Sequence, residues 1–333
     1  QSGGDWWRHP NGTGPFELLE WTVGQRLVLE RHDGYYRGAA HVQYVTFRFT
    51  GSPMMLYETG EIDITQIGTT DIERALDPAN VLNEQLLIVP QLSLGYVGFN
   101  NAIPPFDDEK VRQAFCHAVD KEGIISILLK NTVSPAYGIL PPGIPGHDEG
   151  LEGLKYDVAQ AQRLLAESSY REGLPPVVLA VPGFCTEVAP SAEALAWMWQ
   201  ENLGVDVEIQ LVEWDTFFDE LREGTLQAFE IGWIADYADA ENFLDLLFHS
   251  ESVENHTCYN NPVVDELLEE AGVEADVESR MATYQAAEHA IVEDAPLLPL
   301  WFERSYFLVK PYVEGFSPTP MVAPIYRDVR VDR

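Results

Sequence analysis

One acidic residue follows a run of apolar and aromatic residues and could bind a cation. Asp236 lies in the stretch EIGWIADYADAENFLDLLF, three residues after Trp233 and directly before Tyr237. A carboxylate among aromatic side chains can hold an ammonium group through charge-assisted hydrogen bonds, and the aromatic faces add cation–π attraction. The alternative is a structural carboxylate that caps a helix, a role for which Asp239 is better placed because an acidic first turn follows it.

The elements around Asp236 alternate between strands and helices. Strand patterns occur at residues 16–22, 25–31, 41–49, 63–67, 84–90, 93–101, 176–181, 205–211 and 230–235, and helix patterns at 69–76, 107–119, 157–168, 189–204, 262–271 and 276–294. Such alternation predicts an α/β fold with a largely parallel or mixed sheet. Asp236 then follows the carboxyl end of a strand, where α/β sheets bind their ligands.

Two of these elements have a clear apolar face, and one loop is unusually long. In the helix that Asp107 or Asp108 can cap, the apolar positions recur at helical spacing: Val111, Ala114, Phe115, Ala118 and Val119. In the strand at 205–211 apolar and polar residues alternate, so its apolar residues should face one way. Residues 130–153 form a Pro- and Gly-rich loop, which we expect to cover or line a site.

Composition limits the partners of this protein. The 333 residues include 54 acidic and 20 basic side chains, for a net charge of −34. A chain this acidic repels nucleic acid and anionic lipid. No apolar run reaches the roughly 20 residues of a membrane span, so we expect no span in this chain. The sequence starts without Met and without a signal-peptide pattern, so we expect a processed product. The cellular location cannot be predicted from a targeting signal in this sequence.

The sequence carries no recognised catalytic motif. It has no G-x-S-x-G, H-E-x-x-H, P-loop or G-x-G-x-x-G pattern. Paired carboxylates for glycoside hydrolysis remain an alternative, but most of the acidic residues should be solvated surface groups. We therefore expect a protein that is not an enzyme and that needs no cofactor.

A transition-metal site is a second alternative. His249, His256 and Cys258 lie close in sequence, and Cys116 adjoins His117. Soft ligands of this kind can bind transition metals, but their spacing matches no standard site. The three cysteines, the third being Cys185, are widely spaced, and we expect three buried thiols rather than a disulfide pair.

The stretch around Asp236 resembles the GW..DY.DP..FL segment of solute-binding protein family 5. These proteins are the extracytoplasmic receptors of ABC importers for peptides, nickel and related ligands. Further segments match in the family's order: NGTGPFELLEW, LVLERHDGYYRG, ETGEIDI, YVGFNNAIPPFDDEKVRQAFCHAVDKEGII, YDVAQAQRLLAESSY, YNNPVVDELLEEA, YQAAEHAIVEDAPLLPLW and KPYVEGF. The likeness runs from about Asn11 to Phe316, and Ala240 stands where the family usually has Pro.

The resemblance implies a periplasmic-binding-protein fold of type II, with two lobes joined by hinge strands and the ligand between them. Residues 1–98 would be the remainder of an incomplete first lobe, 99–299 the second lobe and 300–333 the return crossing. The segments YVGFNN and PLLPLW would be the hinge strands. In the family a substantial N-terminal part precedes the GTGPF strand, whereas only ten residues precede NGTGPF here.

The resemblance also implies ligand-binding residues. The Asp three residues after the Trp holds the ligand's α-amino group in peptide-binding members, and that position is Asp236, with Trp233 and Tyr237 as pocket walls. The other candidates are Asn100 at the end of a hinge strand, Phe184 and Cys185 in the loop after a strand, and Tyr259, for which a packed aromatic is the better interpretation. Dipeptide receptors use an Arg near 182–186, but this chain has no Arg or Lys between Arg171 and Arg222. A carboxylate clamp of that type is therefore not expected.

Together these observations predict an extracytoplasmic receptor, periplasmic or extracellular, that captures oligopeptide-like solutes and delivers them to ABC permease subunits. A nickel, metal-complex or other cationic-solute receptor of the same family is the alternative, and a carboxylate-based hydrolase is a more distant one. Membrane anchoring in the full-length protein is compatible with the absence of a signal from this sequence.

Overall fold

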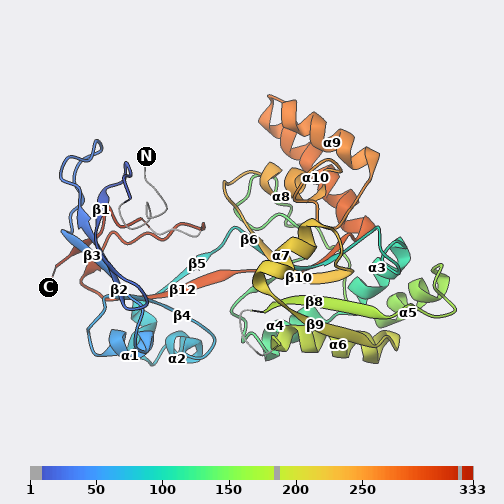
Figure 1. Cartoon of the computed structure of the whole chain (residues 1–333), viewed down its shortest axis with the longest axis horizontal. Coiled ribbons are helices and arrows are strands. Elements are labelled where there is room, and N and C mark those ends of the chain that lie inside the picture. The colour runs from blue at the N-terminus through green and yellow to red at the C-terminus, as the bar shows by residue number, and fades with distance from the viewer. Residues whose placement is uncertain (1–9, 184–187, 322–324, 333) are drawn as a thin grey trace. The chain divides into compact units, whose positions relative to one another are not determined.

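The structure is a computed structural model that describes residues 10–183, 188–321 and 325–332. The chain divides into two compact units (Figure 1): unit 1 comprises residues 1–89 and 305–333, and unit 2 comprises residues 90–304. Unit 2 is thus one continuous segment inserted into unit 1. The second lobe predicted from the sequence, residues 99–299, lies entirely within unit 2, which is longer at both ends.

Unit 1 is built mainly from short antiparallel strands. β1 (Phe16–Thr22), β2 (Arg26–Arg31) and β3 (Tyr44–Arg48) form one sheet, and β4 (Ile64–Ile67), β12 (Arg304–Val309) and β5 (Leu86–Pro90) form a second. The remaining elements are α1 (Pro53–Glu58), α2 (Ile72–Leu76), a 3-10 helix (Val81–Gln85), β13 (Val313–Glu314) and β14 (Arg330–Val331). A turn joins β1 and β2, and Gly24 adopts a φ of +71° there, which favours glycine.

Unit 2 contains a mixed six-stranded sheet. Its strands, in spatial order, are β7 (Ser134–Pro135), β11 (Leu297–Phe302), β6 (Ser93–Phe99), β10 (Ala228–Ile234), β8 (Val177–Gly183) and β9 (Val207–Glu213). β8 is parallel to both β9 and β10, whereas β6 is antiparallel to β10 and β11. The segments YVGFNN and PLLPLW, expected as hinge strands, contribute β6 and β11 to this sheet and lie within unit 2.

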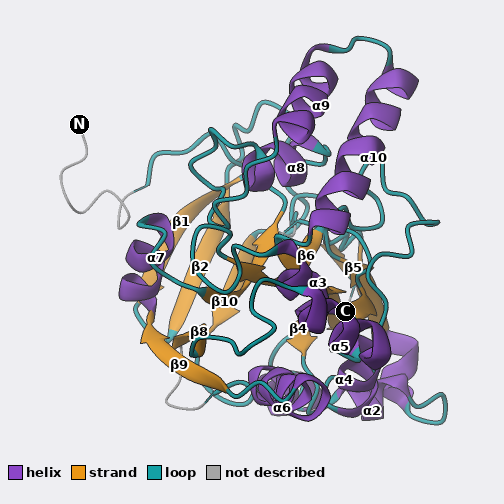
Figure 2. Ribbon diagram, turned by 90° about the vertical axis from the view of Figure 1, so that its right-hand side faces the viewer, coloured by secondary structure: helices purple, strands orange, loops and turns teal. Residues whose placement is uncertain are grey.

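Helices cover both faces of this sheet (Figure 2). They are α3 (Glu109–His117), α4 (Lys121–Ile127), α5 (Val158–Glu167), α6 (Pro190–Leu203), α7 (Trp214–Arg222), α8 (Glu241–Phe248), α9 (Pro262–Val273) and α10 (Val277–Asp294). Of the two caps considered for α3, Asp107 and Asp108, the structure has Asp108, whose side chain accepts a hydrogen bond from the Lys110 amide at 2.8 Å. The first four of these helices pack on one face, while α7 packs against β8 and β9 from the other.

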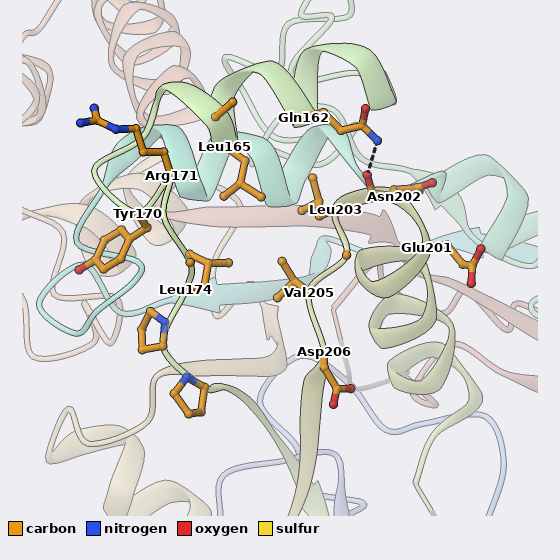
Figure 3. Close-up of a pocket in the computed structure, with 15 residues that line it drawn as sticks. Gln162, Leu165, Tyr170, Arg171, Leu174, Glu201, Asn202, Leu203, Val205 and Asp206 are labelled. Carbon is orange, nitrogen blue, oxygen red and sulfur yellow. Dashed lines mark hydrogen bonds between the residues drawn. The ribbon is translucent and has the colours of Figure 1, made fainter.

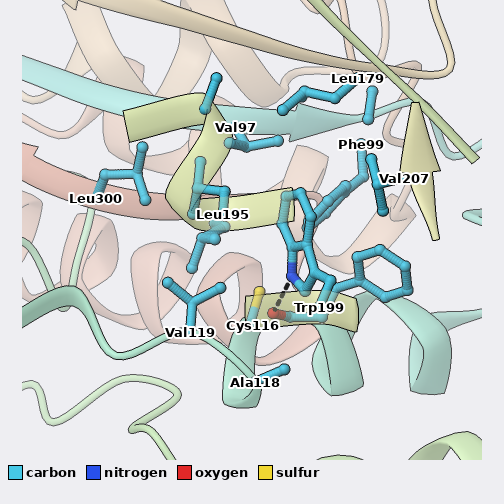
Figure 4. Close-up of a cluster of buried hydrophobic side chains, with 14 of the residues drawn as sticks. Val97, Phe99, Cys116, Ala118, Val119, Leu179, Leu195, Trp199, Val207 and Leu300 are labelled. Atoms are coloured by element: carbon cyan, nitrogen blue, oxygen red, sulfur yellow. Dashed lines mark hydrogen bonds between the residues drawn. The ribbon is translucent and has the colours of Figure 1, made fainter. Parts of the chain in front are cut away.

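The largest core of unit 2 lies between the sheet and α3 to α6. The five apolar residues predicted for the helix at 107–119 are all buried. Trp199 of α6 is 1% exposed, and its indole N–H donates to the Phe115 carbonyl at 3.0 Å (Figure 4). Burial of this aromatic cluster removes much apolar surface from water and fixes the helices against the sheet.

Leu211 of β9 is 39% exposed and lines a pocket, whereas Val207 is buried and Ile209 is partly buried. The expectation of three buried thiols was wrong. Cys258 is exposed rather than buried, and Cys116 is buried with a free thiol. Cys185 lies outside the described residues. None of the helices in the described ranges combines the length and apolar character that crossing a membrane requires.

Candidate functional site

The strands of unit 2 bring several chain segments to one end of the sheet. β8, β9 and β10 are parallel, so their carboxyl ends meet there. Because β6 is antiparallel to β10 and to β11, β6 begins and β11 ends at the same place. In register, Gly232 of β10 is opposite Gly95 of β6, which is in turn opposite Trp301 of β11. This is the end of an α/β sheet where ligands are expected.

Two adjoining hollows lie at this end. The first, named here the Trp233 pocket, has a volume of about 540 Å³ and is lined by residues that include Tyr96, Phe218, Ile231 and Trp233. The second, named here the Glu230 pocket, measures about 510 Å³, and its lining includes Val181, Leu211, Glu230 and Trp301. The two share Gly95, Tyr96, Pro182, Ile231, Gly232 and Glu303.

A pair of glycines explains why the shared surface is hollow. Gly95 and Gly232 are cross-strand partners, so neither strand places a side chain on that part of the sheet. A Cβ on Gly95 would lie 2.7 Å from the Trp301 Nε1, which shows that the indole lies directly over this glycine. A Cβ on Gly232 would meet its nearest atom, the Leu94 carbonyl oxygen, at 3.4 Å, an ordinary contact. The absence of a side chain at Gly95 therefore makes room for the Trp301 indole, and its absence at Gly232 leaves the pocket surface open.

One buried amide positions both Trp233 and Asp236. Asn242 of α8 is fully buried, and its Oδ1 accepts a hydrogen bond from the Trp233 indole N–H at 3.2 Å. The same oxygen accepts one from the Asp236 backbone N–H at 3.1 Å. The backbone of Asp236 and the ring of Trp233 are thus fixed relative to each other by a side chain that water does not reach.

The loop that carries Asp236 is also fixed at its far end. Asp239 accepts a hydrogen bond from the Glu241 amide at 3.0 Å, as expected of a residue at a helix start, although α8 itself begins one residue later than a cap at 239 would place it. Its carboxylate makes a bidentate ion pair with Arg280 of α10, at 2.8 and 2.9 Å, which holds the pKa of Asp239 below its usual range. This geometry is the strong form of a charged contact.

The carboxylate of Asp236 itself has no hydrogen bond or ion pair with any residue that the structure describes. The residue is exposed, and Tyr237 beside it is 41% exposed. A carboxylate on a fixed backbone, with both oxygens available, can accept charge-assisted hydrogen bonds from an arriving ammonium group at little conformational cost.

Two basic side chains that line the Trp233 pocket, His256 and Arg222, each lie near a carboxylate. His256 Nε2 lies 3.3 Å from the Glu254 carboxylate, and burial lowers the pKa of the imidazole. Arg222, also in this pocket, lies 3.6 Å from Asp219 on its own helix. His256 and Cys258 were considered as metal ligands, but the described residues contain no group of three or more His, Cys, Asp or Glu side chains arranged to hold a metal.

Two carboxylates line the Glu230 pocket. Glu230 Oε1 accepts a hydrogen bond from the Ser191 hydroxyl at 3.0 Å, and burial raises the pKa of its carboxyl. Glu303 accepts one from the Trp301 indole N–H at 2.9 Å, and burial raises the pKa of this carboxyl as well. Both shifts have the same cause, since a partly desolvated carboxylate is less stable without a cation nearby.

Asn100 and Tyr259 lie within the core of unit 2. The Asn100 amide is fully buried, with its nitrogen donating to the Gly224 and Leu226 carbonyls at 2.9 and 3.1 Å and its oxygen accepting from the Ala102 amide. Tyr259 is 3% exposed and donates its hydroxyl to Asp294. Neither has a polar group left for a ligand, so we leave both out of the site. Phe184 and Cys185 lie outside the described residues.

A larger hollow of about 770 Å³ lies at the opposite end of unit 2 (Figure 3). It is bordered by α5 and by the connection between α6 and β9, where Gln162 donates a hydrogen bond to the Asn202 carbonyl at 2.8 Å. This end carries the amino ends of β8 and β9, and none of the predicted site residues lies there. We therefore place the candidate site at the two smaller pockets.

Sequence reasoning missed three residues of the candidate site. Glu230 is the one acidic residue inside the otherwise apolar strand β10, and that isolation was the available signal. Asn242 looked like an ordinary residue of a helix first turn, and Glu303 looked like surface charge. Their roles depend on packing between segments that are distant in the chain.

The position of Asp245 leads to a prediction about stability. Burial raises the pKa of this α8 carboxyl from 3.8 to about 6, and its Oδ2 is shielded from water with no hydrogen-bond partner among the described residues. Between about pH 4 and pH 6 the native protein therefore holds a proton that the unfolded chain has lost. The free energy of unfolding should fall as pH rises through this window, by at most about 3 kcal/mol from this residue.

We expect Asp245→Asn to remove that loss. The variant should be more stable than the parent by about 1–3 kcal/mol at pH 7, and the two should differ little at pH 4. Urea unfolding at both pH values measures the difference. An effect of the substitution that is the same at both pH values would contradict the assignment.

With the geometry in place, comparison with known proteins identifies the family. The model described as bacterial extracellular solute-binding proteins, family 5 Middle, matches residues 1–255. The chain belongs to this family. The resemblance that the sequence motifs indicated is thereby confirmed.

Relatives in family 5 include receptors for different solutes. The chain is 29% identical over 327 residues to the periplasmic oligopeptide-binding protein OppA of Escherichia coli, covering 94% of this chain and 60% of OppA. It is 32% identical over 329 residues to the probable deoxycholate-binding periplasmic protein YgiS of the same organism, with the same coverage of 94% and 60%. The chain thus spans about 60% of the length of these curated relatives.

The fold of family 5 is found in solved structures. The structure of the murein tripeptide binding protein MppA of Escherichia coli matches with a TM-score of 0.80 at 28% identity, over 99% of this chain and 66% of that chain. The predicted fold class, a periplasmic-binding-protein α/β fold, is confirmed by this match.

Proposed function

We propose that this protein is the substrate-binding component of an ABC importer and that it binds oligopeptide-like solutes through their free amino terminus. The observation that carries the proposal is the Asp236 carboxylate, which has no partner among the described residues, while Asn242 fixes its backbone beside the Trp233 pocket. An ammonium group at Asp236 would gain charge-assisted hydrogen bonds and the nearby aromatic surface of Trp233 and Tyr237.

The names of the relatives support the peptide as ligand. OppA is described as an oligopeptide-binding protein and MppA as a murein tripeptide binding protein. YgiS is described as probably deoxycholate-binding, so membership of the family alone does not fix the ligand class. The unpaired carboxylate favours a cationic group over a bile acid anion, because like charges at short range repel.

The proposed mechanism is reversible capture without covalent chemistry. The resemblance to the family implies closure of two lobes around the solute, and a ligand can drive closure only through contacts that are better made in the closed state. Delivery would be to ABC permease subunits, in a periplasmic or extracellular location. OppA and YgiS, which are both periplasmic proteins, support the periplasmic location.

Native mass spectrometry of the intact purified protein, followed by calorimetric titration, tests the proposal. We expect a co-purified peptide, or heat of binding with free-amine tri- to pentapeptides, and no comparable binding of deoxycholate or Ni²⁺. Tight binding of deoxycholate or Ni²⁺ together with the absence of peptide binding would overturn the peptide assignment and favour another solute of the family.

A further inference from the structure

The proposed amino-terminal contact leaves the carboxylate of Glu230 unexplained. One of its oxygens accepts a hydrogen bond from Ser191 at the start of α6, at 3.0 Å. The other, Oε2, is shielded from solvent and has no hydrogen-bond partner among the described residues. A carboxylate oxygen left in this state costs free energy unless something pairs with it.

A purely structural role for Glu230 explains only half of these contacts. The carboxylate lies at the amino-terminal end of α6, whose dipole favours a negative charge there. The Ser191 hydroxyl needs only one acceptor, which Oε1 provides. A neutral Gln side chain could accept this hydrogen bond equally well, so the capping contact does not account for the second oxygen or for the charge.

The surroundings of Glu230 suit the arm of a cationic ligand. The floor of the Glu230 pocket is the glycine pair Gly95 and Gly232, and its walls include the apolar side chains of Val181, Leu211 and Trp301. Glu303 is a second carboxylate in the same pocket, and no Lys or Arg is found among the described residues that line it. The described lining of this pocket thus combines an apolar wall with two carboxylates and contains no Lys or Arg.

We propose that the Glu230 pocket is a subsite for a second positive group of the ligand, an ammonium or guanidinium on an apolar arm, as in a lysine or arginine side chain. The inference rests on the proposed function and deepens it by naming the substrate class as a basic oligopeptide. An aliphatic stem would pack along Leu211 and Trp301 while its charged end reaches the Glu230 carboxylate.

The spacing of the two carboxylates indicates where the basic residue stands in the peptide. Glu230 and Asp236 are six positions apart on and just after β10, a span of at most about 20 Å in extended backbone. An extended ligand residue covers about 3.4 Å, and a lysine side chain reaches about 6 Å further. With the amino terminus at Asp236, the basic side chain should belong to the third, fourth or fifth residue.

Calorimetry with matched peptides tests the subsite. The probes are penta-alanine peptides that carry either lysine or norleucine, which has a stem of similar length without the charge, at each position from the second to the fifth. For the intact parent protein we expect the lysine peptide to bind at least tenfold more tightly than its norleucine partner at the third, fourth or fifth position. Equal affinities at every position would overturn the subsite.

Two variants locate the effect on Glu230. Glu230→Gln keeps an acceptor for Ser191, and we expect it to reduce the lysine preference to within about twofold while norleucine peptides bind as before. Glu208→Gln removes the same charge from an exposed position of β9 and should leave the preference intact. If the lysine preference persists in Glu230→Gln, or if Glu208→Gln also removes it, the preference arises from the overall negative charge of the protein. Either result would overturn the assignment of the subsite to Glu230.

A failure of the proposed function has a different signature. If neither lysine nor norleucine peptides bind, the peptide-receptor assignment fails, and 1,5-diaminopentane then tests the pocket alone. Binding of this diamine by the parent and not by Glu230→Gln would retain a cation subsite on a receptor for another solute. No diamine binding to the parent would overturn the subsite as well.

Discussion

Replacing Asp236 by Asn should weaken the binding of peptides with a free amino terminus by about 10- to 100-fold. The expected loss corresponds to one hydrogen-bonded charge contact, worth about 1.5–3 kcal/mol. The asparagine side chain occupies the same volume, and the backbone hydrogen bond to Asn242 does not depend on the charge. The substitution should therefore change affinity without changing the position of the loop. Titration calorimetry with a peptide and its N-acetylated form measures the effect.

The acetylated peptide provides the decisive comparison. It lacks the ammonium group, so its weaker binding should be nearly the same for the parent and for Asp236→Asn. Asp206→Asn, an equal change of charge at an exposed position near the amino end of β9, is the matched control and should leave both affinities unchanged. An equal loss for free and acetylated peptides in Asp236→Asn would reject the role of Asp236 as an anchor for the amino group.

Replacing Trp199 by Ala should lower the free energy of unfolding by about 3–5 kcal/mol, the cost of a large cavity in a closely packed core. The indole is 1% exposed, its ring centroid lies 5.2 Å from that of Phe115, and its N–H donates to a backbone carbonyl. The alanine variant loses the packing and leaves the Phe115 carbonyl without this donor. Denaturant unfolding followed by circular dichroism measures the loss.

The same helix contains a matched control for that substitution. Trp197 of α6 is 60% exposed, so Trp197→Ala removes the same side chain from a position that contributes little to the core. We expect a change within about 0.5 kcal/mol there. Similar losses for the two variants would mean that helix propensity or solubility, rather than burial, determines the stability of this region.

The fold was largely predictable because its strongest signals are local. The helix at 107–119 was recognised from apolar residues at helical spacing, and its cap from Asp108. The parallel strand β8 was recognised from its apolar run, and β9 from its alternation of apolar and polar residues. Alternation predicted that Leu211 faces the same way as Val207 and Ile209, but it does not show how much of each side chain is covered, and Leu211 is 39% exposed. A family motif also does not show which sheet a strand joins, and only the structure places β6 and β11 in the six-stranded sheet of unit 2.

The candidate site was predictable only in part. Asp236 and Trp233 stand together in the sequence, so their types and spacing were enough to select them. Glu230 was not selected from the sequence, and the contact with Ser191 on α6 shows that it is partly enclosed. The two glycines of the pocket floor lie on strands from distant parts of the chain. Their pairing depends on the register between β6 and β10, which the sequence does not show. Asn100 was selected because it is a polar residue at a strand end. In the structure it is buried, and its amide nitrogen donates hydrogen bonds to two backbone carbonyls.

The insertion of unit 2 into unit 1 has a practical consequence for isolating the candidate site. The Gln91 amide donates to the Glu303 carbonyl at 2.9 Å, so the two ends of the inserted segment are adjacent and already joined by a backbone hydrogen bond. Both pockets are lined by residues of this segment alone. A gene fragment encoding residues 90–304 would therefore carry every described wall of the site on one polypeptide whose termini meet, ready for excision, transplantation into another host protein or joining head to tail.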